Sequence, residues 1–192
     1  MKVIAFNGSA RKKGNTTSLL NIVLDEIRAK GGETELVEFA GLNLSGCKAC
    51  YQCFESKNNR CVVDDDLINE SIEKMLAADA IILGSPTYFA DVSANMKAFM
   101  ERTGMVSRAN GDIYRRKVGA SVVAVRRAGA SHVFSSLNNF FLIGQMVLAA
   151  SSYWNIGIGR DPGEVMDDAE GVKTMKDLGV NIAWLINKIN AE

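Results

Sequence analysis

The sequence predicts an α/β fold in which a doubly wound, five-stranded parallel sheet carries helices on both faces. Three observations predict it. Short apolar runs alternate with longer segments of helical spacing, a glycine-containing turn follows the first run, and no internal repeat or linker interrupts the pattern. We therefore expect one domain over residues 1–192, with a cysteine-rich loop at 45–63.

The apolar runs mark the expected strands, which lie at 3–6, 36–37, 80–83, 120–125 and 153–158. Segments with apolar residues every three to four positions mark the expected helices, at 16–30, 65–77, 93–103, 132–150 and 168–189. The glycine pair at 31–32 ends the first of these helices. Since such sheets bind ligands beyond the carboxyl ends of their strands, the loops after the first, third and fourth strands are candidate binding loops.

Composition and charge limit the partners. The 192 residues are 47% hydrophobic and 23% charged, as in an ordinary soluble domain. Lys and Arg together number 22, as do Asp and Glu, so no net positive charge favours nucleic acid. No apolar run approaches the ~20 residues that cross a bilayer, and the N-terminus lacks the apolar region of a secretory signal. We expect a cytoplasmic protein without a membrane partner.

The loop after the first strand has the residues of a phosphate site. Residues 8–17 read GSARKKGNTT and lead into a helix, where free backbone N–H groups and the helix dipole favour an anion. The loop has no Walker lysine and no dinucleotide glycine triplet, which disfavours ATP and a Rossmann-bound dinucleotide. A solvated helix cap is the alternative. The side chains that could donate to a phosphate are Ser9, Arg11, Asn15, Thr16 and Thr17.

Two further loops could enclose a planar ring. After the third strand, Pro86 fixes a turn that presents Thr87, Tyr88 and Phe89, although these aromatic rings could instead close the core. After the fourth strand, a small-residue turn contains Ala128 and Gly129.

These loops resemble the GS-x-R-x-x-GNT and G-[ST]-P-x-Y-x motifs of the flavodoxin-like NAD(P)H-dependent FMN reductases. The resemblance implies a flavodoxin-like fold with the FMN phosphate in the first loop. It also implies that residues 86–89 contact the isoalloxazine ring, that Ala128 and Gly129 approach its pyrimidine edge, and that NAD(P)H is a possible electron donor.

The cysteines form the most specific motif. All four lie within 15 residues, as Cys47, Cys50, Cys53 and Cys61, which in a reducing compartment is more typical of metal binding or catalysis than of disulfides. Three-residue steps nearly eclipse in a loop with three residues per turn, so the first three thiolates can face one centre and the fourth can return to it. Four thiolates suit a 4Fe-4S cluster. Zinc, which usually takes two separated pairs, and redox-active or free thiols are the alternatives.

This motif narrows the resemblance to the iron-sulfur flavoproteins. The leading prediction is an FMN-dependent electron-transfer oxidoreductase, whose 4Fe-4S cluster passes single electrons between a ferredoxin-like carrier and the flavin. One alternative is a cluster-free NAD(P)H-dependent FMN or quinone reductase, and another is a noncatalytic FMN or thiol redox sensor. The apolar stretches at 140–143 and 146–148 exceed one helix face, which predicts a homodimer or homotetramer.

Overall fold

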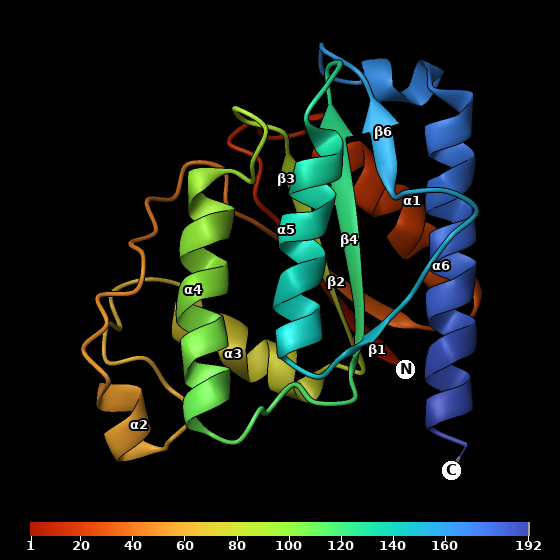
Figure 1. Ribbon diagram of the computed structural model, residues 1–192. Helices are drawn as coiled ribbons and strands as arrows, with labels where there is room; N and C mark the ends of the chain where they lie inside the picture. Colours follow the sequence, from red (N-terminus) through yellow and green to blue (C-terminus); the bar gives the residue numbers. More distant parts are fainter. Residues whose placement is uncertain (192) are drawn as a thin grey trace.

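The computed structural model describes residues 1–191, and its centre is a parallel sheet (Figure 1). The strands are β1 (Lys2–Asn7), β2 (Glu33–Glu38), β3 (Ala80–Pro86), β4 (Val118–Val125), β5 (Val147–Leu148) and β6 (Ile156–Ile158). Their order is β2-β1-β3-β4-β5, and β6 also pairs with β4. The predicted doubly wound parallel sheet is confirmed.

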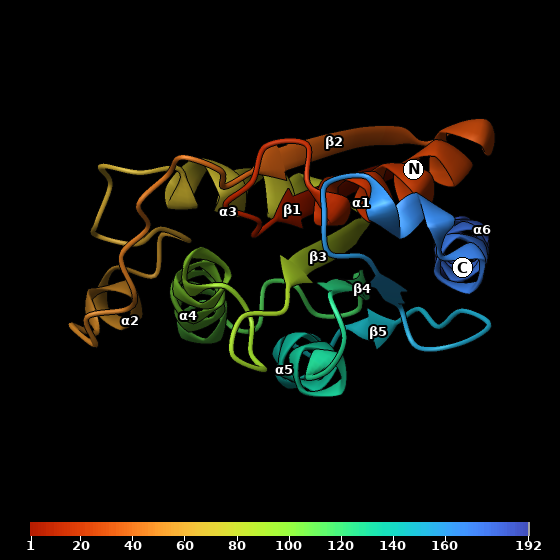
Figure 2. The ribbon, with the colours of Figure 1, turned by 90° about the horizontal axis from the view of Figure 1, so that it is seen from above.

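Helices cover both faces of this sheet (Figure 2). They are α1 (Asn15–Ala29), α2 (Gln52–Ser56), α3 (Ile68–Ala77), α4 (Ala94–Ala109), α5 (Ala130–Ile143) and α6 (Ala169–Ile189), with a 3-10 turn η1 (Glu164–Asp167). Strand side chains alternate between two cores. Val3 and Ala5 join the core under α1 and α6, whereas Ile4 and Phe6 join the core under α3, α4 and α5.

The loops after β1 and β3 meet because these strands are neighbours at the point where the strand order reverses. The Gly8 amide donates to the Gly84 carbonyl at 2.8 Å. Ser93, the N-cap of α4, donates to the Gly8 carbonyl at 2.6 Å. A Cβ on Gly8 would lie 2.8 Å from Met96 Cβ, so glycine permits this close approach. The sheet thus holds the two predicted binding loops together.

The region 132–150 differs from the prediction of one helix. Helix α5 ends at Ile143, Gly144 caps it, and Gln145 adopts a left-handed φ of 55°. The chain then forms β5, in which Val147 pairs with Val118. Apolar content alone does not distinguish a buried helix from an edge strand, and here the open edge of β4 selects the strand.

The expected strand at 153–158 is also wrong in its first half. Only Ile156–Ile158 pairs with β4, whereas Tyr153 and Trp154 are exposed in the loop that joins β5 to β6. The fifth position of the sheet is therefore shared by two short strands. The other predicted elements are confirmed with shifted ends. In particular, α4 continues to Ala109, and the unpredicted α2 lies within the cysteine-rich loop. Across residues 1–191, no helix has the length and apolarity that a membrane crossing requires.

Candidate functional site

A cavity of about 240 Å³ lies at the carboxyl edge of the sheet, and we call it the edge cavity. Its walls come from the loops after β1, β3, β4 and β6. The lining residues are Ser9, Arg11, Gly14, Asn15, Thr16, Pro86, Thr87, Tyr88, Ala124, Val125, Arg126, Gly159 and Arg160.

One end of the edge cavity suits an anion. Arg11 donates to the Arg160 carbonyl at 3.2 Å, and Asn15 accepts from the Gly163 amide at 2.8 Å, so two distant loops are joined there. Gly14 caps α1, and no side chain within residues 1–191 caps this helix. First-turn amides, the helix dipole, Arg11 and Arg160 together favour a phosphate.

The other end suits a planar ring with polar edges. Pro86, Tyr88 and Val125 are among its lining residues. The Thr87 hydroxyl is buried, and no hydrogen-bond partner for it occurs in the part of the chain that the structure describes. Such an orphaned group costs about 1–3 kcal/mol, which a polar ligand atom can offset.

The four cysteines line a second, smaller hollow of about 20 Å³, the cysteine cavity. Figures 1 and 2 show that the loop containing α2 lies on the outer side of α4, away from the sheet. Residues Ala49, Tyr51, Lys57 and Asn59 have left-handed φ between 45° and 60°. Non-glycine residues in this region carry strain, so other contacts must hold the loop in its wrapped shape.

Side chains from neighbouring helices supply those contacts. Glu101 accepts from the Cys47 amide at 3.2 Å, and Asn69 accepts from the Cys61 amide at 2.8 Å. Asn110, the C-cap of α4, accepts from the Asn59 amide at 3.2 Å. The loop is thus anchored at its start, through Cys47, and near its end, through Asn59 and Cys61.

Arg102 is a charged residue that lines the cysteine cavity and is only 1% exposed. Its Nε donates to Cys61 Sγ at 3.4 Å, its Nη2 donates to the Val63 carbonyl at 2.7 Å, and Nη1 pairs with Asp66. Burial disfavours the charged guanidinium, but the hydrogen bonds to Asp66 and Cys61 outweigh it and raise the pKa of Arg102. Arg102 therefore brings a permanent positive charge to the cysteine cavity.

The thiols share this cavity without forming a closed ligand set. Burial raises the pKa of the Cys53 thiol, and the neighbouring thiols raise it further. Within residues 1–191, no three Cys, His, Asp or Glu side chains are placed to hold a metal ion. The cysteine cavity therefore has the ligand atoms that a metal cluster needs, but its sulfur atoms must move closer together to bind one.

Comparison with known proteins assigns the chain to a protein family. Residues 1–161 match the family described as NADPH-dependent FMN reductase. An iron-sulfur flavoprotein of Methanocaldococcus jannaschii is 37% identical over 98% of this chain and 99% of its own length. The chain belongs to the iron-sulfur flavoproteins of this FMN reductase family. It is 32% identical to the iron-sulfur flavoprotein of Methanosarcina thermophila over 98% of this chain and 97% of that protein.

The fold agrees with this family assignment. An archaeal flavodoxin structure has a TM-score of 0.63 and 18% identity, and the match covers 97% of this chain and 99% of that one. The flavodoxin-like fold and the class of flavin-dependent oxidoreductase are confirmed. FMN is the cofactor of the family, and the edge cavity fits it, because the end with the arginines and the start of α1 suits the phosphate, and the orphaned Thr87 hydroxyl belongs to a lining residue that could meet a polar edge of the ring.

Most of the residues predicted for FMN line this edge cavity together, namely Ser9, Arg11, Asn15, Thr16, Pro86, Thr87 and Tyr88. Four do not. Thr17 donates to Glu38 at 3.0 Å, and Phe89 is fully exposed with a left-handed φ of 49°. Ala128 lies outside the lining, and Gly129 packs against Ala90, where a Cβ would approach the Ala90 Cα to 2.9 Å.

Sequence reasoning missed two groups of residues. Gly159 and Arg160 line the edge cavity because they follow β6, a strand of three residues that periodicity does not detect. Arg102 was missed in the middle of α4. A detectable signal existed, because Arg102 falls three residues after Phe99 and four before Val106, on the buried face of the helix.

Proposed function

We propose that this iron-sulfur flavoprotein carries a 4Fe-4S cluster on Cys47, Cys50, Cys53 and Cys61 and exchanges single electrons between a ferredoxin-like carrier and FMN. One observation carries the proposal. All four thiols of the chain line a single cavity into which the buried guanidinium of Arg102 donates a hydrogen bond. Four thiolates are the ligand set of such a cluster, and hydrogen bonds to its sulfur atoms tune its potential.

Charge supports this assignment over a set of inert thiols. Four thiolates around an iron-sulfur core are negative overall, and burying that charge needs a compensating cation. Arg102 brings a positive charge beside the thiols, shared with Asp66, which pairs with it and holds it in place. Asp66 and the Val63 carbonyl engage the two Nη atoms of Arg102, so its Nε remains for the sulfur of Cys61.

FMN would supply one- and two-electron chemistry in the edge cavity. Ser9, Arg11, Asn15 and Thr16 would bind its phosphate, while Pro86, Thr87 and Tyr88 would contact its ring system. Thr17, Phe89, Ala128 and Gly129 stay predictions, since they lie outside the cavity lining. No protein acid or base is assigned to the electron transfer.

The test compares electron donors on anaerobically reconstituted protein. Reduced ferredoxin should reduce the bound flavin, and removal of the iron should abolish that reaction while leaving reduction by dithionite. Visible spectra and iron and sulfide analysis monitor the cluster. Flavin reduction by ferredoxin at an unchanged rate in iron-free protein would overturn the proposal.

A cluster-free NAD(P)H-dependent reductase is the second candidate. The exposed ring of Tyr88 in the lining of the edge cavity favours it, because a cofactor bound there would be open to a nicotinamide from solvent. In that case NADPH should reduce the flavin equally fast with and without iron. The same donor comparison therefore separates the two candidates.

Self-association is part of the proposal. Leu142 and Ile143 at the end of α5 are 57% and 64% exposed, more than a monomer would leave at neighbouring apolar positions. Met146 and Leu148, expected on the same helix, lie beyond it. We expect a homodimer or homotetramer by sedimentation, and Leu142→Gln should weaken it.

A further inference from the structure

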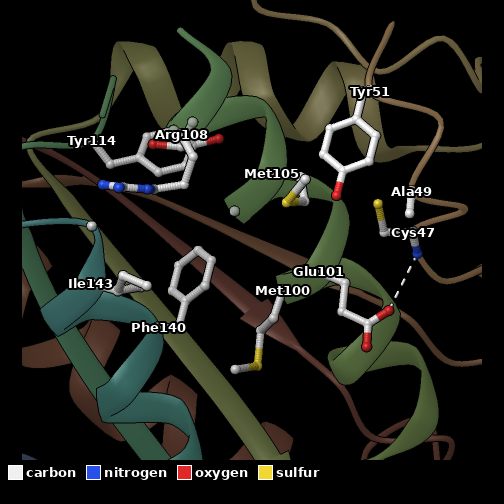
Figure 3. Close-up of a pocket in the computed structure, with 13 residues that line it drawn as sticks. Cys47, Ala49, Tyr51, Met100, Glu101, Met105, Arg108, Tyr114, Phe140 and Ile143 are labelled. Carbon is white, nitrogen blue, oxygen red and sulfur yellow. Dashed lines mark hydrogen bonds between the residues drawn. The ribbon is translucent and has the colours of Figure 1, made fainter. Parts of the chain in front are cut away.

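A third cavity lies between α4, α5 and the start of the cysteine-rich loop (Figure 3). Its volume is about 500 Å³, within the range of sites for small organic ligands. Met100, Met105, Phe140 and Ile143 give it apolar walls, and Gly104 faces Phe140 without a side chain of its own. We call it the helix cavity. It is separate from the edge cavity, with which it shares no lining residue.

Two buried hydroxyls belong to the walls of the helix cavity. Tyr114 is 1% exposed and Ser107 is 3% exposed, and neither hydroxyl has a hydrogen-bond partner among residues 1–191. Burial raises the pKa of Tyr114, so its phenol stays a neutral donor. The charged lining residues Glu101 and Arg108 already pair with Lys97 and Asp112. A neutral donor beside mainly apolar walls suits a ligand with an uncharged acceptor, such as a carbonyl oxygen.

The helix cavity adjoins the cysteine cavity. Cys47, Tyr51 and Met105 line both. Figure 3 shows Tyr51 and Cys47 on one side of the helix cavity, with Phe140, Ile143 and Tyr114 on the other. A ligand in this position would lie next to the thiol site, which favours a ligand that accepts electrons.

We infer that the helix cavity binds an uncharged, planar quinone, with one carbonyl oxygen accepting a hydrogen bond from Tyr114. The methionine and phenylalanine side chains would cover the ring faces, since thioether sulfur and aromatic groups pack well against planar rings.

The redox consequence rests on the proposed function. One quinone takes two electrons and two protons and becomes the hydroquinone. The electrons would come in two single steps from a reduced ferredoxin-like carrier through the cysteine-held cluster, and the protons from solvent at the cavity mouth. Binding itself does not need the cluster, so the two ideas can fail separately.

The test measures binding of 2,3-dimethyl-1,4-naphthoquinone to the FMN-loaded full-length protein by calorimetry, with and without reconstituted iron. This probe has no unsubstituted quinone carbon that a thiol could attack. Tyr114→Phe should weaken binding about three- to tenfold, because one hydrogen bond is lost. Its melting temperature should not fall, since the hydroxyl has no protein partner to lose. Tyr153→Phe, at an exposed tyrosine outside the lining, is the matched control and should bind normally.

A filling variant tests the location. A Cβ at Gly104 would lie 3.5 Å from Phe140, an ordinary contact, so Gly104→Leu fits the helix and occupies the cavity. It should abolish quinone binding and leave FMN affinity unchanged. Undiminished binding in Gly104→Leu, or equal binding by Tyr114→Phe and wild type, would overturn the inference. Failure of the wild-type oligomer to bind the quinone would also overturn it if the monomers obtained on dilution bind no better. In that case, coverage of the cavity by a second copy of the chain would not explain the failure.

A missing cluster has a different signature. If reconstitution yields no iron but the quinone still binds and Gly104→Leu blocks it, the site stands and the cluster proposal fails. If iron assembles but the quinone does not bind, the cluster proposal stands and the quinone site fails.

Discussion

The edge cavity and the cysteine cavity are built in different ways. Strand ends and the start of α1 form the edge cavity, so the hydrogen bonds of the sheet fix most of its backbone. The cysteine cavity is formed by an irregular loop with four left-handed residues, held by side chains of α3 and α4. The first site is therefore organised by the fold itself, whereas the second depends on a few side chains and on what its thiols bind.

Cys53→Ser should separate the two sites most strongly. The thiol lies in α2, outside every element that lines the edge cavity, so the variant should keep its fold and its FMN. Iron should fall from about four per chain in reconstituted wild type to well below that value, because one of four ligands is lost. Metal analysis and flavin absorbance measure both quantities. Loss of FMN together with iron would contradict the independence of the sites.

Arg102→Met should give the next largest effect. It removes one partner of a buried ion pair and leaves Asp66, which is 13% exposed, without its cation. Breaking such a pair costs about 3–5 kcal/mol, and the low end applies here because Asp66 keeps some solvent. Urea unfolding should show the loss, and iron uptake should also fall. Arg60→Met, which breaks only exposed ion pairs, is the control and should cost less than about 1 kcal/mol.

Arg11→Ala probes the phosphate end of the edge cavity. A charge-assisted hydrogen bond is worth about 1.5–3 kcal/mol, so FMN should bind about ten- to a hundredfold more weakly, as fluorescence titration would show. Riboflavin, which has no phosphate, should bind poorly to wild type. Lys12→Ala removes a charge from the same loop at a residue that does not line the cavity and should change little. Equal losses in both variants would point to general attraction rather than a phosphate contact.

The same contrast explains how much the sequence predicts. The edge cavity follows from local rules, because a strand, a glycine turn and a helix start suffice to place Ser9, Arg11 and Asn15 near one another. The loop after β6 was missed, since three residues are too few for a periodic pattern. The end of α5 was also missed, because the apolar stretches at 140–143 and 146–148 fit a helix and an edge strand equally well.

For the cysteine cavity, the sequence predicts the ligand residues but not the side chains that position them. Spacing predicts that four thiols gather, and they do line one cavity. It does not predict the partners that hold the loop, because Arg102, Asn69 and Asn110 act over 8 to 51 residues of sequence separation. Such contacts depend on how helices pack and are not encoded in any one segment.

Thr87→Val should give the smallest effect, because it removes a single hydroxyl from the lining of the edge cavity. The buried Thr87 hydroxyl has no partner within residues 1–191, so its removal should not lower the free energy of unfolding of the FMN-free protein. FMN affinity should fall about three- to tenfold if the flavin supplies the missing hydrogen bond.

Thr103→Val is the crossed control for this last prediction. The Thr103 hydroxyl is buried and donates to the Phe99 carbonyl at 2.8 Å, away from the edge cavity. Its loss should cost about 1 kcal/mol of stability and leave FMN affinity unchanged. Opposite responses in the two variants would show that the edge cavity keeps a polar group unpaired in order to bind its ligand. Parallel losses of stability would instead make Thr87 an ordinary structural residue and remove the hydroxyl from the flavin site.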